Sequence, residues 1–285
     1  MSNLNNDVFT MRQNMKNPDF ECFYYKNYPS IKIPFHQHDF YEVFFFLDGN
    51  VSYIIEGKIY QLRSGDILLT NNRDIHKPVF ENGKPYERFI LWIEPEFLEQ
   101  MNGLDCDLKA CFNDSSEKKH KLIRPDSMAF SNLKRIFEKM LRNRDLAELG
   151  SHTLSQIYLI EFLVYLNRAY FATPDTIYGD ITENQKINQI VAYINKNFAE
   201  EISLNDICEN FYISKSHLTH LFKKYTGLTL YQFIIKKRLT VARNMLKENK
   251  PVMQACIECG FSDYSNFLKA FKREFGQNPK NIKNR

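Results

Sequence analysis

The last third of the chain carries the same pattern twice, and this duplication limits the possible folds more than any other feature. Six positions from Leu218 to Gly227 match six positions from Phe267 to Gly276 at an offset of 49 residues. Ahead of each copy, apolar residues recur at i, i+3, i+4 and i+7, which predicts a shorter amphipathic helix. Only three or four residues separate the helices of each pair. The repeat therefore predicts two helix-turn-helix motifs.

The second helix of each motif has an outward face that suits DNA. Its hydroxyl, imidazole and ammonium groups can bond base edges and phosphates in a major groove. A single exposed lysine is as readily a solvated side chain, so the repeated arrangement is what indicates DNA binding. The residues expected to contact DNA are Lys215, Ser216, Thr219, His220 and Lys223 in the first copy, and Tyr264, Ser265, Leu268, Lys269 and Lys272 in the second.

A longer helix is predicted between the two motifs. Thr229 and Gln232 match a capping box at its start, and the helical pattern continues to about Lys247. A rod of this length could hold the two reading helices about one DNA turn, ~34 Å, apart. We expect its three successive cations, Lys236, Lys237 and Arg238, to approach phosphates as well.

The charge of the chain is divided unevenly. Residues 181–285 hold 17 Lys and Arg against 9 Asp and Glu, a net charge of +8, whereas residues 1–180 have a net charge of −4. A basic module behind a mildly acidic one is typical of a nucleic-acid reader with a separate sensing part. Hydrophobic residues make up 44% of the 285 residues, which is enough for more than one core and excludes a disordered tail.

Short apolar stretches between turn signals fill residues 35–93. The turns, among them Asp48-Gly49-Asn50, recur roughly every 8 to 12 residues, and this spacing predicts a β-sandwich or barrel. Residues 51–55 and 58–62 predict a hairpin across the turn at Glu56 and Gly57.

A group of histidine and glutamate residues lies in this β-rich region. His36, His38 and Glu42 stand at i, i+2 and i+6, so one extended strand would direct all three to one face, and His76 follows a later turn. The four could bind a divalent metal such as Zn, Fe, Mn or Ni. We favour a small-molecule pocket in the barrel mouth, suited to a sugar or another polar cyclic compound, and expect no other cofactor. The residues expected to line it are His36, His38, Glu42, Tyr53, His76 and Trp92.

The middle of the chain predicts two helices. Residues 126–149 are amphipathic, with a basic side that is most simply solvated. Residues 153–170 are apolar around most of the helix, which requires burial either inside the domain or against a partner. We favour the contact in a homodimer. Thr173 and Pro174 then begin a predicted linker, which gives four segments: 1–125, 126–172, 173–182 and 183–285.

The ends of the chain and its cysteines indicate a cytoplasmic location. Residues 1–10 are polar and do not match a signal peptide, and the longest apolar stretch is too short to span a membrane. The six cysteines form no evenly spaced framework, which suits a reducing compartment. Cys256 and Cys259 both fall on the packing stripe of a helix, so we expect them to be structural and not a redox or zinc motif.

Residues 183–285 resemble the DNA-binding domain of AraC/XylS transcription regulators. The resemblance rests on Leu221 to Gly227 (LFKKYTG), Arg238 to Arg243 (RLTVAR), Gly260 to Asp263 (GFSD) and Phe271 to Pro279 (FKREFGQNP). His36, His38, Glu42 and Gly49 fit the first cupin motif, His-x-His-x3-Glu-x6-Gly, and Gly65, Asp66 and His76 resemble part of the second. Departures from the family pattern are Tyr212 in place of Gly in the first turn, His220, and Leu268.

The resemblance implies an α+β multidomain protein: a cupin-like β-barrel with a helical dimerisation segment, followed by an all-α domain with two helix-turn-helix motifs. It further implies a dimeric regulator, not an enzyme, that binds double-stranded promoter DNA and a small-molecule effector, with RNA polymerase as a further partner and no membrane association. A carbohydrate-related role is expected. The competing interpretation is a metal-dependent cupin enzyme with an appended DNA-binding domain.

Overall fold

The computed structural model describes residues 4–10, 14–28, 33–80, 85–101, 105–113, 121–146, 148–173 and 179–282. The chain divides into two compact units. The first comprises Met1–Pro34, Asp39–Tyr53 and Tyr60–Thr182; the second comprises Glu183–Arg285 together with the short segments Phe35–His38 and Ile54–Ile59. Among the described residues, no helix is both long enough and apolar enough to cross a membrane.

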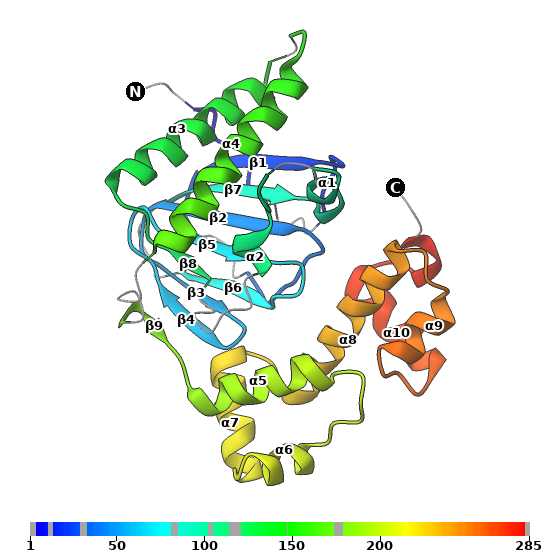
Figure 1. Ribbon diagram of the computed structural model, residues 1–285. Helices are drawn as coiled ribbons and strands as arrows, with labels where there is room; N and C mark the ends of the chain where they lie inside the picture. Colours follow the sequence, from blue (N-terminus) through cyan, green and yellow to red (C-terminus); the bar gives the residue numbers. More distant parts are fainter. Residues whose placement is uncertain are drawn as a thin grey trace. The chain divides into compact units, whose positions relative to one another are not determined.

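Two β-sheets form the centre of the first unit (Figure 1). The first sheet contains, in spatial order, β1 (Phe20–Asn27), β7 (Tyr86–Ile93), β2 (Tyr41–Asp48), β5 (Ile67–Thr70) and β8 (Leu122–Ile123), all antiparallel. The second contains β6 (His76–Phe80), β3 (Val51–Ile55), β4 (Lys58–Gln61) and β9 (Ile181–Thr182). Two short helices, α1 (Pro95–Gln100) and α2 (Ala110–Asn113), follow β7.

Two long helices, α3 (Ser127–Arg144) and α4 (Ser151–Ala172), pack together against one face of the first sheet (Figure 1). Successive strand residues point to opposite faces, so Phe89 of β7 joins the core under these helices while Arg88 does not. The ring of Phe89 stacks on that of Phe137 in α3 at 4.6 Å between centroids, and Phe137 meets Phe162 of α4 edge-on at 5.6 Å. This aromatic column accounts for the apolar character of the predicted middle helices.

The structure corrects one sequence prediction in the first sheet. The hairpin formed by β3 and β4 is confirmed. However, β2 begins only at Tyr41, so His36 and His38 precede the strand and do not share an extended segment with Glu42. In addition, β1 lies before the region expected to be β-rich, because its pairing with β7, and not its local pattern, defines it as a strand.

The second unit is helical. Its helices are α5 (Gln185–Asn197), α6 (Leu204–Asn210), α7 (Lys215–Thr226), α8 (Leu230–Lys247), α9 (Val252–Glu258) and α10 (Tyr264–Phe275), followed by the 3-10 turn η2 (Pro279–Ile282). The predicted fold class, a β-rich part followed by an all-α part, is confirmed.

Capping side chains define where the helices of the two motifs begin. Ser214 accepts a hydrogen bond from the His217 N–H at the start of α7, and Asp263 accepts one from the Asn266 N–H at the start of α10. The expected capping box of Thr229 with Gln232 opens α8. Because each cap is a local interaction, sequence could predict it.

The long helix α8 belongs to two small cores. Phe233 on its first half meets Phe222 of α7 edge-on at 5.4 Å. On its second half Leu239 and Leu246 pack with α9 and with Phe267 of α10. Thus α8 connects the two helix-turn-helix motifs, as its position in the sequence predicted.

Candidate nucleic-acid interface and ligand site

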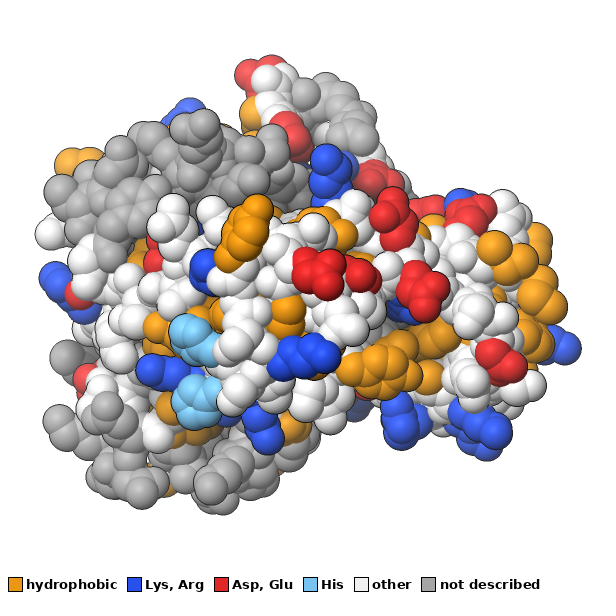
Figure 2. Space-filling model, turned by 90° about the horizontal axis from the view of Figure 1, so that it is seen from below, with side chains coloured by type: hydrophobic (Ala, Val, Ile, Leu, Met, Phe, Trp, Pro, Cys, Tyr) orange, Lys and Arg blue, Asp and Glu red, His pale blue; other side chains and the backbone are white. Residues whose placement is uncertain are grey.

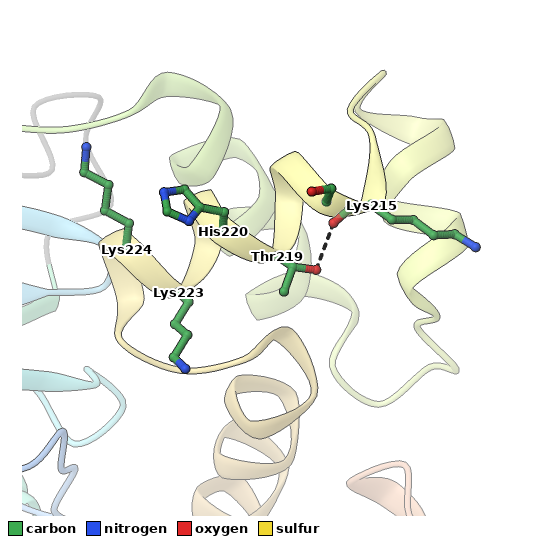
Figure 3. A pocket seen from close by; sticks show the side chains of 6 residues that line it. Lys215, Thr219, His220, Lys223 and Lys224 are labelled. Atoms are coloured by element: carbon green, nitrogen blue, oxygen red, sulfur yellow. Dashed lines mark hydrogen bonds between the residues drawn. The ribbon is translucent and has the colours of Figure 1, made fainter.

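The outward face of α7 gathers all five DNA-contact candidates of the first motif. They line one shallow hollow of about 730 Å³ and all are exposed; the lining is Lys215, Ser216, Thr219, His220, Lys223 and Lys224. Figure 3 shows these side chains projecting from the helix, with the Thr219 hydroxyl donating to the Lys215 carbonyl at 2.8 Å. Figure 2 shows histidine beside Lys or Arg side chains on one molecular face, which also carries acidic side chains elsewhere. Hydroxyl, imidazole and ammonium donors therefore share one accessible surface.

The outward face of α10 is built in the same way, with less hydrogen-bonding capacity. Ser265, Lys269 and Lys272 are exposed, whereas Tyr264 and Leu268 are only partly so. Phe267 and Phe271 are fully buried on the opposite side and hold this helix in the core. The hydrogen-bonding groups of this motif thus centre on two lysines and a serine.

Three cations on α8 are held within the helical unit, which the sequence did not predict. Lys236 pairs with Glu274 of α10, and Lys237 is buried. Arg238 donates to the Phe198 carbonyl at 2.7 Å and to the Glu200 carbonyl at 2.6 Å, and burial lowers its pKa. The expectation that they face phosphates is therefore not supported by their contacts; they join α8 to α10 and to the segment after α5.

Two further exposed residues lie in the first turns of α7 and α10 and were not among the predicted DNA contacts. His217 and Asn266 are equivalent, each three residues after its capping residue, and both side chains are exposed. An asparagine can bond adenine through two hydrogen bonds, and a histidine can contact a base edge or phosphate. Their position can be read from the sequence by counting three residues from each cap, and not only along the buried stripe.

Between the two sheets of the first unit lies a layer of aromatic and polar side chains, which we call the inter-sheet layer. It contains the buried residues Glu42, Phe44, Tyr53, Tyr86 and Arg88 and the half-buried Trp92. The Trp92 indole N–H donates to Glu42 Oε2 at 2.7 Å. Tyr53 hydrogen-bonds the same carboxylate, and burial, followed by the Glu42 charge, raises the Tyr53 pKa well above its ordinary value of 10.0. Three predicted ligand-site residues are thus connected directly.

Three of the four candidate metal ligands come together. His38, Glu42 and His76 are buried, and one possible ligand atom from each lies within 4.8 Å of the others. His76 Nδ1 lies 3.0 Å from the Asp74 carbonyl, and its ring stacks near Tyr53 at 6.0 Å between centroids. His36 is outside this group, with its ring centroid 6.3 Å from that of His38. Two imidazoles and one carboxylate are a donor set that suits Zn, Fe or Mn.

Two family models and several known proteins are similar to this chain. A family model described as an AraC-like ligand binding domain matches residues 17–163, and one described as a helix-turn-helix domain matches residues 207–285. The HTH-type transcriptional activator RhaS of Salmonella schwarzengrund is 26% identical over 256 residues, which cover 90% of this chain and 89% of RhaS.

Among solved structures, apo ToxT from Vibrio cholerae, in a variant form, aligns with 95% of this chain and 98% of its own, at 15% identity and a TM-score of 0.40. A transcriptional regulator of the AraC type from Chromobacterium violaceum covers 34% of this chain and 88% of its own, at 28% identity and a TM-score of 0.33.

Proposed function

The chain belongs to the AraC family of ligand-responsive transcription regulators, and we propose that it controls carbohydrate-related genes by reading promoter DNA with α7 and α10. The observation that carries this proposal is the pair of capped helices whose outward faces bear the residues expected to contact DNA. On α7 these are Lys215, Ser216, Thr219, His220 and Lys223; on α10 they are Tyr264, Ser265, Leu268, Lys269 and Lys272.

The experiment that tests DNA reading is a gel-shift titration against the promoter beside the protein's own gene. Lysine contacts to phosphates release counterions, so the affinity should fall steeply and linearly in a plot of log K against log salt. A scrambled duplex of equal length serves as the control for sequence-independent binding. Absent binding, or binding that salt does not weaken, would contradict the proposal.

We assign the effector to the inter-sheet layer, with His36, His38, Glu42, Tyr53, His76 and Trp92 as its proposed neighbours. Aromatic faces beside a buried carboxylate suit the apolar and hydroxylated faces of a sugar-like molecule. The effector would act by changing the DNA affinity of residues 183–285 through the linker at 173–182, because a ligand shifts an equilibrium only as far as it binds two states differently. Thermal-shift screening with polar metabolites tests this site.

We propose that α4 joins two copies of the chain. One side of this helix is buried against α3, but Leu154, Ile157 and Phe171 leave 42%, 51% and 64% of their surfaces exposed. These positions follow i, i+3 and i+17, so they lie along one stripe of the helix. A second copy of the chain can cover this stripe, because in a symmetric dimer the same apolar surface of each copy packs against the other. Dimerisation would thus belong to residues 126–172, between a sensing segment at 1–125 and the linker.

RNA polymerase is the proposed partner at the promoter, and the cytoplasm is the proposed place of action. Both follow from a DNA-reading function and not from a contact in the molecule. Transcription from the promoter, measured with purified polymerase and with or without the regulator, tests the first, and fractionation of cells tests the second.

A second candidate function, a metal-dependent cupin enzyme with a DNA-binding domain, is favoured by the His38, Glu42 and His76 group. These residues would hold a divalent metal, which acts as a Lewis acid when bound. The Trp92 hydrogen bond to Glu42 would orient that carboxylate. Metal analysis of the purified protein separates the two functions, because less than one equivalent of metal removes the enzyme interpretation.

A further inference from the structure

A buried arginine stands in the inter-sheet layer without a carboxylate partner among the described residues. Arg88 of β7 is 2% exposed. Its Nη1 donates to Asn27 Oδ1 at 2.5 Å and weakly to the Tyr86 carbonyl at 3.4 Å. Neither Nε nor Nη2 has a hydrogen bond within the part of the chain that the structure describes. The group therefore has unused donors on the edge of the guanidinium that binds carboxylates in a bidentate way.

Aromatic rings surround the Arg88 guanidinium. Its carbon lies 3.9 Å from the ring centroid of Tyr86, 4.6 Å from that of Tyr25 and 5.2 Å from that of Phe9. Ring faces stabilise a cation, but they accept no strong hydrogen bond. Burial lowers the Arg88 pKa from its ordinary value, which shows that this environment disfavours the cation. An anion is the chemical group that this cage lacks.

The register of the strands places Arg88 on the inner face of the first sheet. Phe89 and Leu91 belong to the core under α3 and α4, so Arg88 and Trp92 point to the other face. Across β7 and β2, Arg88 pairs with Phe46, and Trp92 pairs with Glu42. Arg88 thus shares the inter-sheet layer with the proposed effector residues.

A second polar group with unused hydrogen-bonding capacity lies in the same layer. Thr70 of β5 pairs directly with Glu42 of β2 and is 2% exposed. Its hydroxyl has no hydrogen-bond partner within the described residues. Burying a hydroxyl without a hydrogen-bond partner is unfavourable, so a ligand that supplies one would be stabilised here. Glu42 and Phe46, the cross-strand partners of Thr70 and Arg88 on β2, lie four residues, or about 13 Å, apart along that strand.

We propose that the effector is an organic acid with hydroxyl groups, whose carboxylate binds Nε and Nη2 of Arg88 and whose hydroxyls reach Thr70 and Glu42. Sugar acids such as uronates combine these two features on one small molecule. The inference rests on the proposed effector site and refines it by naming the charge of the ligand. A neutral sugar would leave the arginine without an anionic partner, so the acid should bind much more tightly.

Matched ligand pairs test the charge of the effector. The full chain is titrated with D-glucuronate against D-glucose, and with D-galacturonate against D-galactose, by calorimetry and thermal shift. We expect the acids to raise the melting temperature and the neutral sugars to leave it unchanged. Equal shifts from both members of a pair, or no shift from any acid, overturn the proposal.

Variants test the assigned residues. Arg88→Gln should weaken acid binding roughly 10- to 100-fold, the range for one charged hydrogen-bonding partner, whereas Arg63→Gln, which changes an exposed arginine of the same unit, should not. Thr70→Val keeps the charge and should weaken binding less. If Arg88→Gln does not fold, Arg88→Lys keeps the cation but removes the bidentate geometry and should still lose affinity. Undiminished acid binding by the folded Arg88 variant overturns the assignment.

Gel shifts without any acid separate this inference from the proposed function. A protein that binds its promoter but responds to no acid contradicts only the effector class. A protein that binds acids through Arg88 but no DNA contradicts the DNA-reading function instead.

Discussion

Tyr212 and Gly260 occupy the same left-handed backbone position in the two helix-turn-helix turns, with φ of +48° and +81°. In each turn the next residue donates its N–H to a carbonyl of the preceding helix at 3.1 Å, from Ile213 to Cys208 and from Phe261 to Cys256. Both α6 and α9 therefore end in the left-handed conformation that glycine usually adopts just after a helix. The two sites differ in their surroundings, because the Tyr212 side chain is 91% exposed while a Cβ at Gly260 would lie 2.3 Å from the Ala199 carbonyl oxygen.

We therefore expect opposite results from substitutions at these two positions. Tyr212→Gly should raise the free energy of unfolding of the helical unit by about 0.5–1 kcal/mol, since a side chain at positive φ costs more than glycine's extra chain entropy. Gly260→Ala should lower it by more than about 2 kcal/mol, because the clash involves backbone atoms. Urea denaturation followed by circular dichroism measures both, and a stabilising Gly260→Ala would contradict the steric explanation.

The two reading helices should respond differently to the loss of single lysines. Lys269→Ala should relax the sequence preference at one base position, with a cost of about 1–3 kcal/mol on the preferred site. Lys215→Ala should weaken all duplexes similarly and reduce the salt slope by about 1. Gel shifts on a panel of single-base variants distinguish the two patterns. Equal, uniform losses from both variants would place Lys269 on a phosphate instead.

An ion-pair group in the first unit predicts a large loss of stability. Arg124 binds both oxygens of Asp66 at 2.8 and 2.7 Å, and that carboxylate is 1% exposed. Arg124→Met should cost about 2–4 kcal/mol, because it leaves a buried charge without its partner. Arg63→Met is the matched control: Arg63 is 65% exposed and pairs only with Asp180 in this group, so its loss should cost less than about 1 kcal/mol. Chemical denaturation compares them, and equal effects would contradict the role of burial.

The cysteines should divide into reactive and protected sets. Burial raises the pKa of Cys22 and of Cys259 to about 12, from an ordinary 9.0, so both stay protonated in the native state. At pH 8, iodoacetamide should label exposed Cys106 rapidly and these two only after unfolding. Mass spectrometry of timed samples gives the labelling rates. Rapid labelling of Cys259 in the native protein would contradict its protection and would support a redox role for Cys256 and Cys259.

The same thiols make stability depend on pH in the alkaline range. In the unfolded chain they ionise near pH 9.0, whereas in the folded protein they do so only near pH 12. Their contribution to stability is therefore complete below pH 9 and is lost progressively as the pH rises toward 12. Denaturation midpoints measured from pH 7 to 11 should be constant at first and then fall, with Cys22→Ala falling less steeply.

The exposed stripe of α4 predicts the state of assembly. Ile157→Glu should convert a dimer to a monomer at micromolar concentration, because it places a charge in the apolar contact. Ser131→Glu, at an exposed position of α3, should leave the dimer intact. Sedimentation equilibrium measures both molar masses. A wild-type protein that is monomeric at all concentrations would overturn the dimer proposal itself.

The sequence alone determined those features that depend on nearby residues. Helix periodicity and the capping box at Thr229 depend on residues within one or two turns of each other. The duplicated periodicity identified both helix-turn-helix motifs. The hairpin across Glu56 and Gly57 was likewise predicted, since its two strands are adjacent in the chain.

Only the tertiary structure decided what depends on strand pairing and on packing between distant elements. The expected single strand through His36 and Glu42 was wrong, because β2 pairs with β5 and β7 only from Tyr41 onward. In the sequence, nothing distinguishes Arg88 from other basic residues. The pairing of β7 with β1 and β2 encloses it among aromatic rings. Burial and the identity of a charge's neighbours come from contacts between residues far apart in sequence, and no local pattern encodes them.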